Sequence, residues 1–234
     1  MYLKRKSSAR LAVAALALFT MKAGAAMAAD LPSTKDVPPV ALEDPRWYLR
    51  IGAAGVFYGS SGKLNAFGMP VAGATASMPN NATVTFDAGY FVLPNIAIQA
   101  TGGIPLIATV NGAGTISSFG TLGKASLGPA MLTVNYVYKD LGPFQPYIGV
   151  GGVYSIIFQT FDRYVRNLNV DGNFGFAIQG GAEYRFNRNW GVFVDAAHMW
   201  LSVNASGLGA GVVPVTARVT LDPTVVRGGI AYHW

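Results

Sequence analysis

The sequence predicts an all-β fold, an eight-stranded antiparallel up-and-down β-barrel that crosses a membrane. Three observations lead to this fold class. A hairpin alternates between two faces, aromatic side chains stand at both ends of its apolar face, and the connections between strands are alternately long and short. Outer-membrane barrels combine long loops on one side with tight turns on the other. We expect residues 46–234 to form this barrel.

The clearest strand pattern is the hairpin from Asp171 to Leu201. Its residues alternate with a period of two on both sides of a turn at 187–189, as paired β-strands do. The continuous apolar face carries Trp190 and Trp200. At about 3.3 Å per residue and a tilt near 40°, these rings stand roughly 25 Å apart, which is the height of the lipid-facing band of an outer-membrane barrel. For this hairpin alone, a soluble sheet with a bulky core is the alternative.

The first residues have the order of an export signal. Basic residues precede the apolar run from Leu11 to Phe19, and the small-residue sequence Ala26-Met27-Ala28 follows it. This order predicts a signal peptide over residues 1–28, and the apolar run is too short for a transmembrane helix. Residues 29–45 are rich in proline and charge and are expected to form a periplasmic N-terminal tail.

Charge and composition argue against several classes of function. The chain has 17 basic and 11 acidic residues, but five of the basic residues lie in the predicted signal peptide, so the mature chain is close to neutral. It therefore lacks the basic patch that nucleic-acid binding requires. The sequence contains no cysteine, which excludes disulfides and thiolate chemistry. We see no metal cluster, phosphate loop or cofactor motif and expect no cofactor.

Eight segments show the strand pattern. They lie at about 46–58, 82–92, 96–108, 124–138, 145–158, 174–186, 190–200 and 214–234. The long connections at 59–81, 109–123, 159–170 and 204–213 are expected to be extracellular loops, which places both termini in the periplasm. Asp222 would face lipid in this assignment, so we expect a bulge at Pro223 or a position above the membrane. The alternation continues to Trp234, as in the terminal strand by which the assembly machinery recognises such barrels.

Several short motifs occur in a fixed order along the chain. They are Phe86 to Phe91 continuing to Ile98, Gly103-Ile104-Pro105, Gly142 to Gly151, Asn189 to Val192 with Asp195, Leu221-Asp222-Pro223, and Gly229 to Tyr232. In this order and spacing the chain resembles the OmpW family of small outer-membrane barrels, although His233-Trp234 departs from that family's usual basic-Phe ending. The resemblance implies a narrow channel for small hydrophobic molecules that leave sideways through the barrel wall.

The residues expected to point inward separate by height. An eight-stranded barrel has room for side chains and little else, so inward charges should pair into a plug. The expected polar plug consists of Arg50, Asp87, Gln99, Asn135, Glu183, Arg185, Asp195 and Arg227. The half above it is apolar and, with two rim prolines, forms the expected substrate pathway of Val56, Pro105, Pro129, Met131, Val153, Ile157, Met199 and Leu201.

An apolar funnel above a polar plug needs an exit other than straight passage. Pro105 and Pro129 fall toward the outer ends of neighbouring strands, and neither can donate a ladder hydrogen bond. We expect a lateral opening there. The alternative, that these prolines only end the ladder at the rim, stays open.

The expected function is therefore uptake of small hydrophobic molecules through an outer-membrane channel. A structural or adhesive barrel of the OmpA or OmpX type, acting through its extracellular loops, is the alternative. Polar, strand-extending loops would favour that alternative, and we expect the apolar loops at 59–81 and 204–213 to be of another kind. Catalysis is not expected, because neither His198 nor His233 has a serine and a carboxylate evidently placed with it.

The expected partners follow from the same location. They are the lipid bilayer, small hydrophobic solutes and, through the C-terminal strand, the barrel assembly machinery. Four basic residues near the predicted outer rim are candidates to bind lipopolysaccharide phosphates. These are Lys124, Arg163, Arg166 and Arg218.

Overall fold

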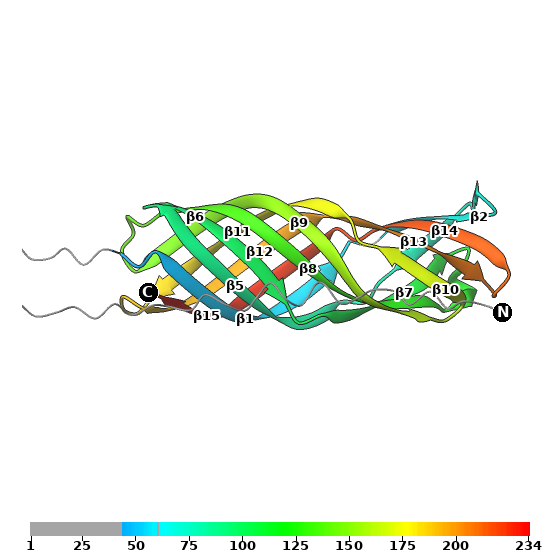
Figure 1. Ribbon diagram of the computed structural model, residues 1–234, viewed down its shortest axis with the longest axis horizontal. Coiled ribbons are helices and arrows are strands. Elements are labelled where there is room, and N and C mark those ends of the chain that lie inside the picture. The colour runs from blue at the N-terminus through cyan, green and yellow to red at the C-terminus, as the bar shows by residue number, and fades with distance from the viewer. Residues whose placement is uncertain (1–43, 60) are drawn as a thin grey trace, which may run out of the picture. The chain divides into compact units, whose positions relative to one another are not determined.

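The computed structural model describes residues 44–59 and 61–234, and these form a closed antiparallel β-barrel (Figure 1). The predicted signal peptide and nearly all of the predicted tail lie outside the described residues. Around the barrel the strands follow the order β8, β6, β5, β1, β15, β12, β11 and β9, and β9 pairs with β8 to close the ring. Their bounds are β1 Trp47–Tyr58, β5 Asn81–Leu93, β6 Ile96–Gly103, β8 Thr121–Val137, β9 Phe144–Asp162, β11 Phe174–Arg185, β12 Trp190–Trp200 and β15 Pro223–His233.

The wall forms because its residues alternate between lipid and lumen. In β12, for example, Val192 and Val194 are exposed while Phe193 and Asp195 are buried. Along β1 the even-numbered residues through Val56 are buried. This period of two is the pattern predicted from the sequence. Within the described residues, no helix is long and apolar enough to cross a membrane.

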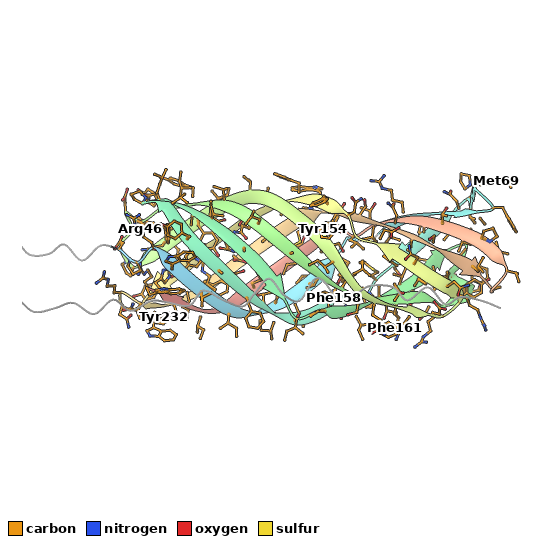
Figure 2. All side chains as sticks on the ribbon, in the orientation of Figure 1. Arg46, Met69, Tyr154, Phe158, Phe161 and Tyr232 are labelled. Atoms are coloured by element: carbon orange, nitrogen blue, oxygen red, sulfur yellow. The ribbon has the colours of Figure 1, made fainter. Side chains whose placement is uncertain are left out.

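Aromatic side chains ring the outside of the barrel at two levels. At the end of the barrel that holds Trp47 and Trp234, here called the terminal end, Trp190 packs against Tyr232 with ring centroids 4.8 Å apart. Farther along the wall, Phe176 and Trp200 stack at 5.7 Å. Figure 2 shows Tyr232 near one end, with Tyr154 and Phe158 farther along the wall. The two predicted aromatic girdles are therefore present.

The predicted long loops are mostly strands, which corrects the expectation that they do not extend the barrel. Five of these strands form a second sheet in the order β10, β13, β14, β2 and β3, at what we call the loop end. The bounds of the added strands are β2 Ser61–Ala66, β3 Met69–Pro70, β4 Ala74–Ser77, β7 Leu106–Gly114, β10 Val165–Asp171, β13 Ser202–Gly209 and β14 Val213–Thr220, and a 3₁₀ turn spans Ser117–Phe119. The sequence pattern did not reveal these strands, because they are rich in small residues and the two faces of each strand therefore differ little in hydrophobicity.

Two of the predicted strands are interrupted. The third divides into β6 and β7 at Ile104-Pro105, and the eighth divides into β14 and β15 at Leu221-Asp222. Asp222 has a positive φ of 31°, and its Oδ1 accepts a hydrogen bond of 2.9 Å from the backbone N–H of Leu201. The expected irregularity thus lies immediately before Pro223, which is buried as the first residue of β15.

A charge on the lipid-facing band should destabilise this barrel. Val194 lies midway between Trp190 and Trp200 and is exposed, so Val194→Arg places a guanidinium in hydrocarbon. We expect a loss of about 2–4 kcal/mol of unfolding free energy, measured by denaturant titration in lipid vesicles. Val212→Arg, at the exposed turn between β13 and β14, is the matched control and should cost little. Equal losses in both variants would contradict the placement of the lipid band.

Candidate functional site: a polar plug below apolar cavities

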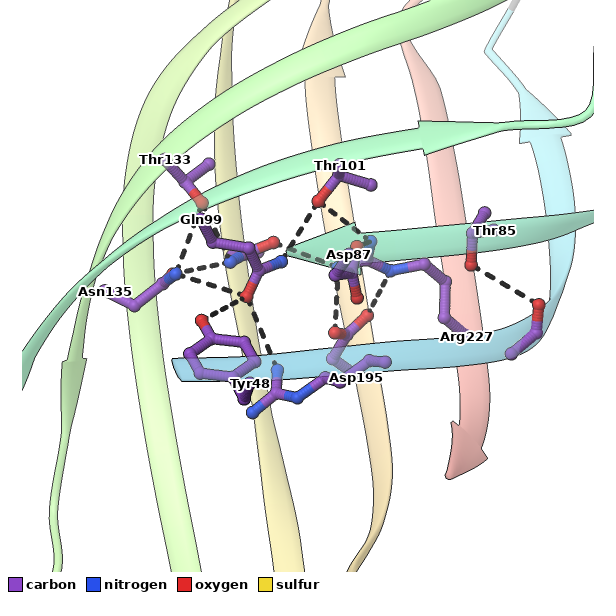
Figure 3. A network of polar contacts seen from close by, with 12 residues as sticks. Tyr48, Thr85, Asp87, Gln99, Thr101, Thr133, Asn135, Asp195 and Arg227 are labelled. Atoms are coloured by element: carbon purple, nitrogen blue, oxygen red, sulfur yellow. Dashed lines mark hydrogen bonds and ion pairs between the residues drawn. The ribbon is translucent and has the colours of Figure 1, made fainter. Parts of the chain in front are cut away.

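A network of buried polar side chains fills the barrel lumen toward the terminal end. Every strand of the wall contributes to it, and Figure 3 labels members from β1, β5, β6, β8, β12 and β15. The buried members that the sequence predicted are Arg50, Asp87, Gln99, Asn135, Glu183, Asp195 and Arg227. Register explains part of the assembly, because Arg50 lies opposite Asp87 on β1 and β5, and Asp195 lies opposite Arg227 on β12 and β15.

Arg227 is the more completely bonded of the two central arginines. Its Nε and Nη2 donate to the two carboxylate oxygens of Asp195 at 2.7 and 2.8 Å. Its Nη1 donates to Asp87 at 3.0 Å and to Thr101 at 3.5 Å, and Nη2 also donates to Gln179 at 3.0 Å. A guanidinium has five N–H groups, so all the donors of Arg227 are used within the protein.

Arg50 joins the other side of the plug. Its Nε and Nη2 both donate to Glu183 Oε2, at 3.1 and 2.7 Å, and its Nη1 donates to Tyr147 Oη at 3.0 Å. The guanidinium also lies over aromatic rings, 4.7 Å from the ring centroids of both Tyr48 and Tyr147. Tyr147 in turn donates to Asp195 at 2.6 Å, which links the two arginine groups.

Amide side chains complete a closed circuit across the lumen. Gln179, which accepts from Arg227, donates to Asn135 Oδ1 at 2.5 Å. Asn135 donates to Gln99 Oε1 at 3.4 Å, and the same oxygen accepts from Arg50 at 3.5 Å. These bonds hold the charged groups in place, as buried ion pairs require, although Asp87 Oδ2 has no hydrogen-bond partner in the described part of the chain.

One predicted member of the plug is wrong. Arg185 is half-buried and donates to the backbone carbonyl of Arg188 in the turn after β11, so it is not part of the network described above. His233 joins the network in place of Arg185, since its Nε2 lies 2.5 Å from Glu183 Oε1. The alternation of β15 puts His233 on the same face as Arg227, and this signal was sufficient to find it. Tyr48, two residues before Arg50, was missed in the same way and donates to Gln99 at 2.9 Å.

Two apolar cavities lie beyond the plug toward the loop end. The first, of about 80 Å³, has walls from β10, β13 and β14 as well as from β7 and β8. The second, of about 50 Å³, lies next to the plug and has Thr85, Thr101 and Arg227 in its lining. Leu127 and Leu221 line both cavities. The cavities therefore adjoin, and we call them the outer and the inner cavity.

The residues of the predicted pathway divide into three groups. Val56, Pro129, Met131, Met199 and Leu201 line the inner cavity. Val153 and Ile157 pack in the apolar cluster of the lumen but do not contribute to the lining of either cavity. Pro105 is exposed and also lies outside the lining, where its neighbours Gly103 and Ile104 stand instead.

The wall is unpaired beside the inner cavity. Pairing between β6 and β8 ends at Thr101 and Met131, and pairing between β7 and β8 begins at Leu106 and Leu127. On the opposite edge of this segment, Ile104 continues the pairing with β5, donating to Val84 O at 2.9 Å and accepting from Thr83 Oγ1 at 2.7 Å. The cavity lining includes residues from both edges of the break.

Comparison with known proteins gives consistent results. The model of the OmpW family matches residues 45–234. A protein named dibenzothiophene metabolism operon protein PahQ, from Pseudomonas aeruginosa, is 37% identical over 79% of this chain and 87% of its own length. Outer membrane protein AlkL from Ectopseudomonas oleovorans is 30% identical over 80% of this chain and 81% of its own.

Solved structures show the same fold. The structure of AlkL in lipid bilayers superposes with a TM-score of 0.65 at 26% identity, covering 89% of this chain and 97% of that chain. The outer membrane protein OprG from Pseudomonas aeruginosa gives a TM-score of 0.77 at 20% identity, covering 82% and 96% respectively. The chain is thus similar to outer-membrane barrels along almost all of its described length.

Removing Arg227 should test the plug. Arg227→Met leaves Asp87 and Asp195 buried without their cation, so we expect a loss of about 3–5 kcal/mol in unfolding free energy. Arg185→Met is the matched control and should cost less than about 0.5 kcal/mol, because Arg185 is only half-buried, at the end of β11. Both are measured by denaturant unfolding of the refolded barrel. A larger loss for Arg185→Met would show that Arg185, not Arg227, anchors the lumen.

Proposed function

Because this chain belongs to the OmpW family and is an integral outer-membrane protein, we propose that it is a channel for the uptake of small hydrophobic molecules. The observation that supports this proposal is the order in which the two cavities and the plug follow one another along the lumen. An apolar outer cavity adjoins an apolar inner cavity, which meets a polar plug whose central arginine has no free donor. Transfer of an apolar molecule from water into such cavities is favourable. Beyond the cavities the molecule meets the polar and charged side chains of the plug.

The exit in this proposal is sideways, through the break between β6/β7 and β8. Straight passage would require opening a circuit of buried ion pairs, whereas the break already lacks ladder hydrogen bonds with β8 along 102–105. Pro105 and Pro129 help to keep it so, because proline has no N–H to donate. The hydrogen bonds between Ile104 and β5 lie on the edge of this segment that faces away from β8, so they do not close the break.

The name of one relative supports the class of solute. PahQ is named for an operon of dibenzothiophene metabolism, and dibenzothiophene is a fused aromatic, apolar molecule. At 37% identity over most of both chains, a related solute class is a reasonable extension to this protein. The apolar lining of both cavities agrees with it.

A structural or adhesive role is the second candidate, and the strand-extended loop end favours it. The second sheet presents exposed residues such as Phe67, Met69 and Val212, and Figure 2 shows Met69 at the extremity of that end. The same sheet, however, supplies Val203, Val215 and other walls of the outer cavity. Its inner face therefore also serves the proposed channel.

Orientation and partners belong to the same proposal. With the terminal end in the periplasm, both termini are periplasmic and the second sheet is extracellular. Arg163, in the turn between β9 and β10, and Arg166, in β10, are both exposed and then lie at the outer surface, where they can contact lipopolysaccharide phosphates. Recognition of the C-terminal strand by the barrel assembly machinery remains a prediction.

Uptake by cells tests the channel directly. Cells with this protein should accumulate naphthalene faster than cells without it, while uptake of a small hydrophilic sugar stays unchanged, because the cavities are apolar and the side chains of the plug fill the lumen beyond them. Radiolabelled solutes and equal expression of an unrelated small barrel provide the measurement and the control. Faster sugar uptake would point to a water-filled pore, and no change in either solute would favour the loop-based role.

A bulky side chain over the wall break should slow apolar uptake severalfold. A Cβ atom at Gly128 would lie 3.4 Å from the Phe158 ring and 3.8 Å from Pro105 Cα, so a side chain can begin there without a clash and Gly128→Phe would place a ring beside the break. Ala196→Phe, on the lipid face of β12, is the matched control.

Replacing Pro105 and Pro129 together by alanine should also slow uptake by allowing ladder bonds. Unchanged naphthalene uptake in both Gly128→Phe and the double proline variant would rule out this exit.

A further inference from the structure

The inner cavity contains a buried hydroxyl with no partner. Ser155 of β9 is 1% exposed and lines this cavity. Its Oγ makes no hydrogen bond within the described part of the chain. Ser155 stands opposite Pro129 in the register of β8 and β9, so it lies on the strand next to the wall break. An unbonded hydroxyl is costly in an apolar space.

The surroundings of Ser155 are otherwise suited to an uncharged, apolar molecule. Met131, Met199 and Leu201 line the same cavity. Arg227 borders it, but all its donors are already bonded and its partners Asp87 and Asp195 carry negative charge. An anionic ligand would thus meet no free cation and two carboxylates. The site favours a neutral ligand.

We propose that the inner cavity selects apolar molecules that carry one neutral oxygen, such as a hydroxyl or carbonyl group, with Ser155 Oγ as the hydrogen-bonding partner. This inference rests on the proposed uptake function and names a solute class within it. A serine hydroxyl both donates and accepts, so it serves either kind of oxygen. Tyr58, whose buried hydroxyl also makes no hydrogen bond within the described part of the chain, lines the same cavity.

The position of Ser155 gives this selection a role in transport. A solute in the inner cavity has the bonded plug on one side and the unpaired wall on the other. A hydrogen bond to Ser155 would hold the oxygen-bearing end of the solute beside Pro129. The apolar body would then lie along the methionine and leucine side chains. A pure hydrocarbon gains only the second of these interactions.

The test compares 1-naphthol with naphthalene, two probes that differ by one hydroxyl. In cells that express the protein, Ser155→Ala should lower the ratio of naphthol to naphthalene uptake by about 3- to 10-fold, the worth of one hydrogen bond. Ser155→Thr keeps the hydroxyl and should restore the ratio. Ser77→Ala removes an exposed hydroxyl of β4 that lines neither cavity, so it should leave the ratio unchanged.

A binding measurement separates selection from folding and from passive entry. Purified wild-type protein and the Ser155→Ala variant in lipid nanodiscs are titrated with 1-naphthol, whose fluorescence reports binding, and with naphthalene. Weaker naphthol binding with unchanged naphthalene binding in Ser155→Ala supports the proposal. Equal effects on both probes, or none, overturn it while the channel function stands. If the protein accelerates uptake of neither probe, the channel function and this inference both fall.

Discussion

The charged network inside the barrel is the constraint on which the rest of the structure depends. Two arginines and three carboxylates are held away from water, and an unpaired charge there would be strongly destabilising. Each group is supplied by a strand whose register must bring it inward. A shift of one residue would turn Arg50 or Asp195 toward lipid. The plug thus selects one pairing of the eight strands, and the lipid-facing aromatic girdles then follow on the opposite face.

The same network shapes the proposed route through the protein. Because all the donors of Arg227 and most polar atoms of the network are bonded within the protein, it offers a solute little to bind. The free space lies above it, in two adjoining apolar cavities. Next to the inner cavity the pairing between β6/β7 and β8 is interrupted, while Ile104 keeps its hydrogen bond to β5. Plug and wall break therefore act together in the proposed lateral exit.

The strand-extended loop end gives the lumen more depth than the lipid band alone requires. β10, β13 and β14 continue the alternation beyond the girdle at Trp200, so Val203, Val215 and Val219 line the outer cavity. An apolar solute arriving from outside would find a covered apolar surface before it reached the level of the membrane. Extension by strands, which the sequence analysis associated with adhesive barrels, is in this protein compatible with both proposed roles.

The sequence by itself determined the barrel, its eight strands and most of the plug, because a period of two assigns each residue to lipid or lumen without further information. It also located the irregular sites at Pro105 and Pro223, where proline chemistry acts locally. Only the tertiary structure showed that Arg185 bonds to the turn after β11 and that His233 reaches Glu183, since these outcomes depend on height in the barrel. It also decided that Ser155 has no partner. Cavities and unpaired groups arise between strands distant in sequence, and no local pattern records them.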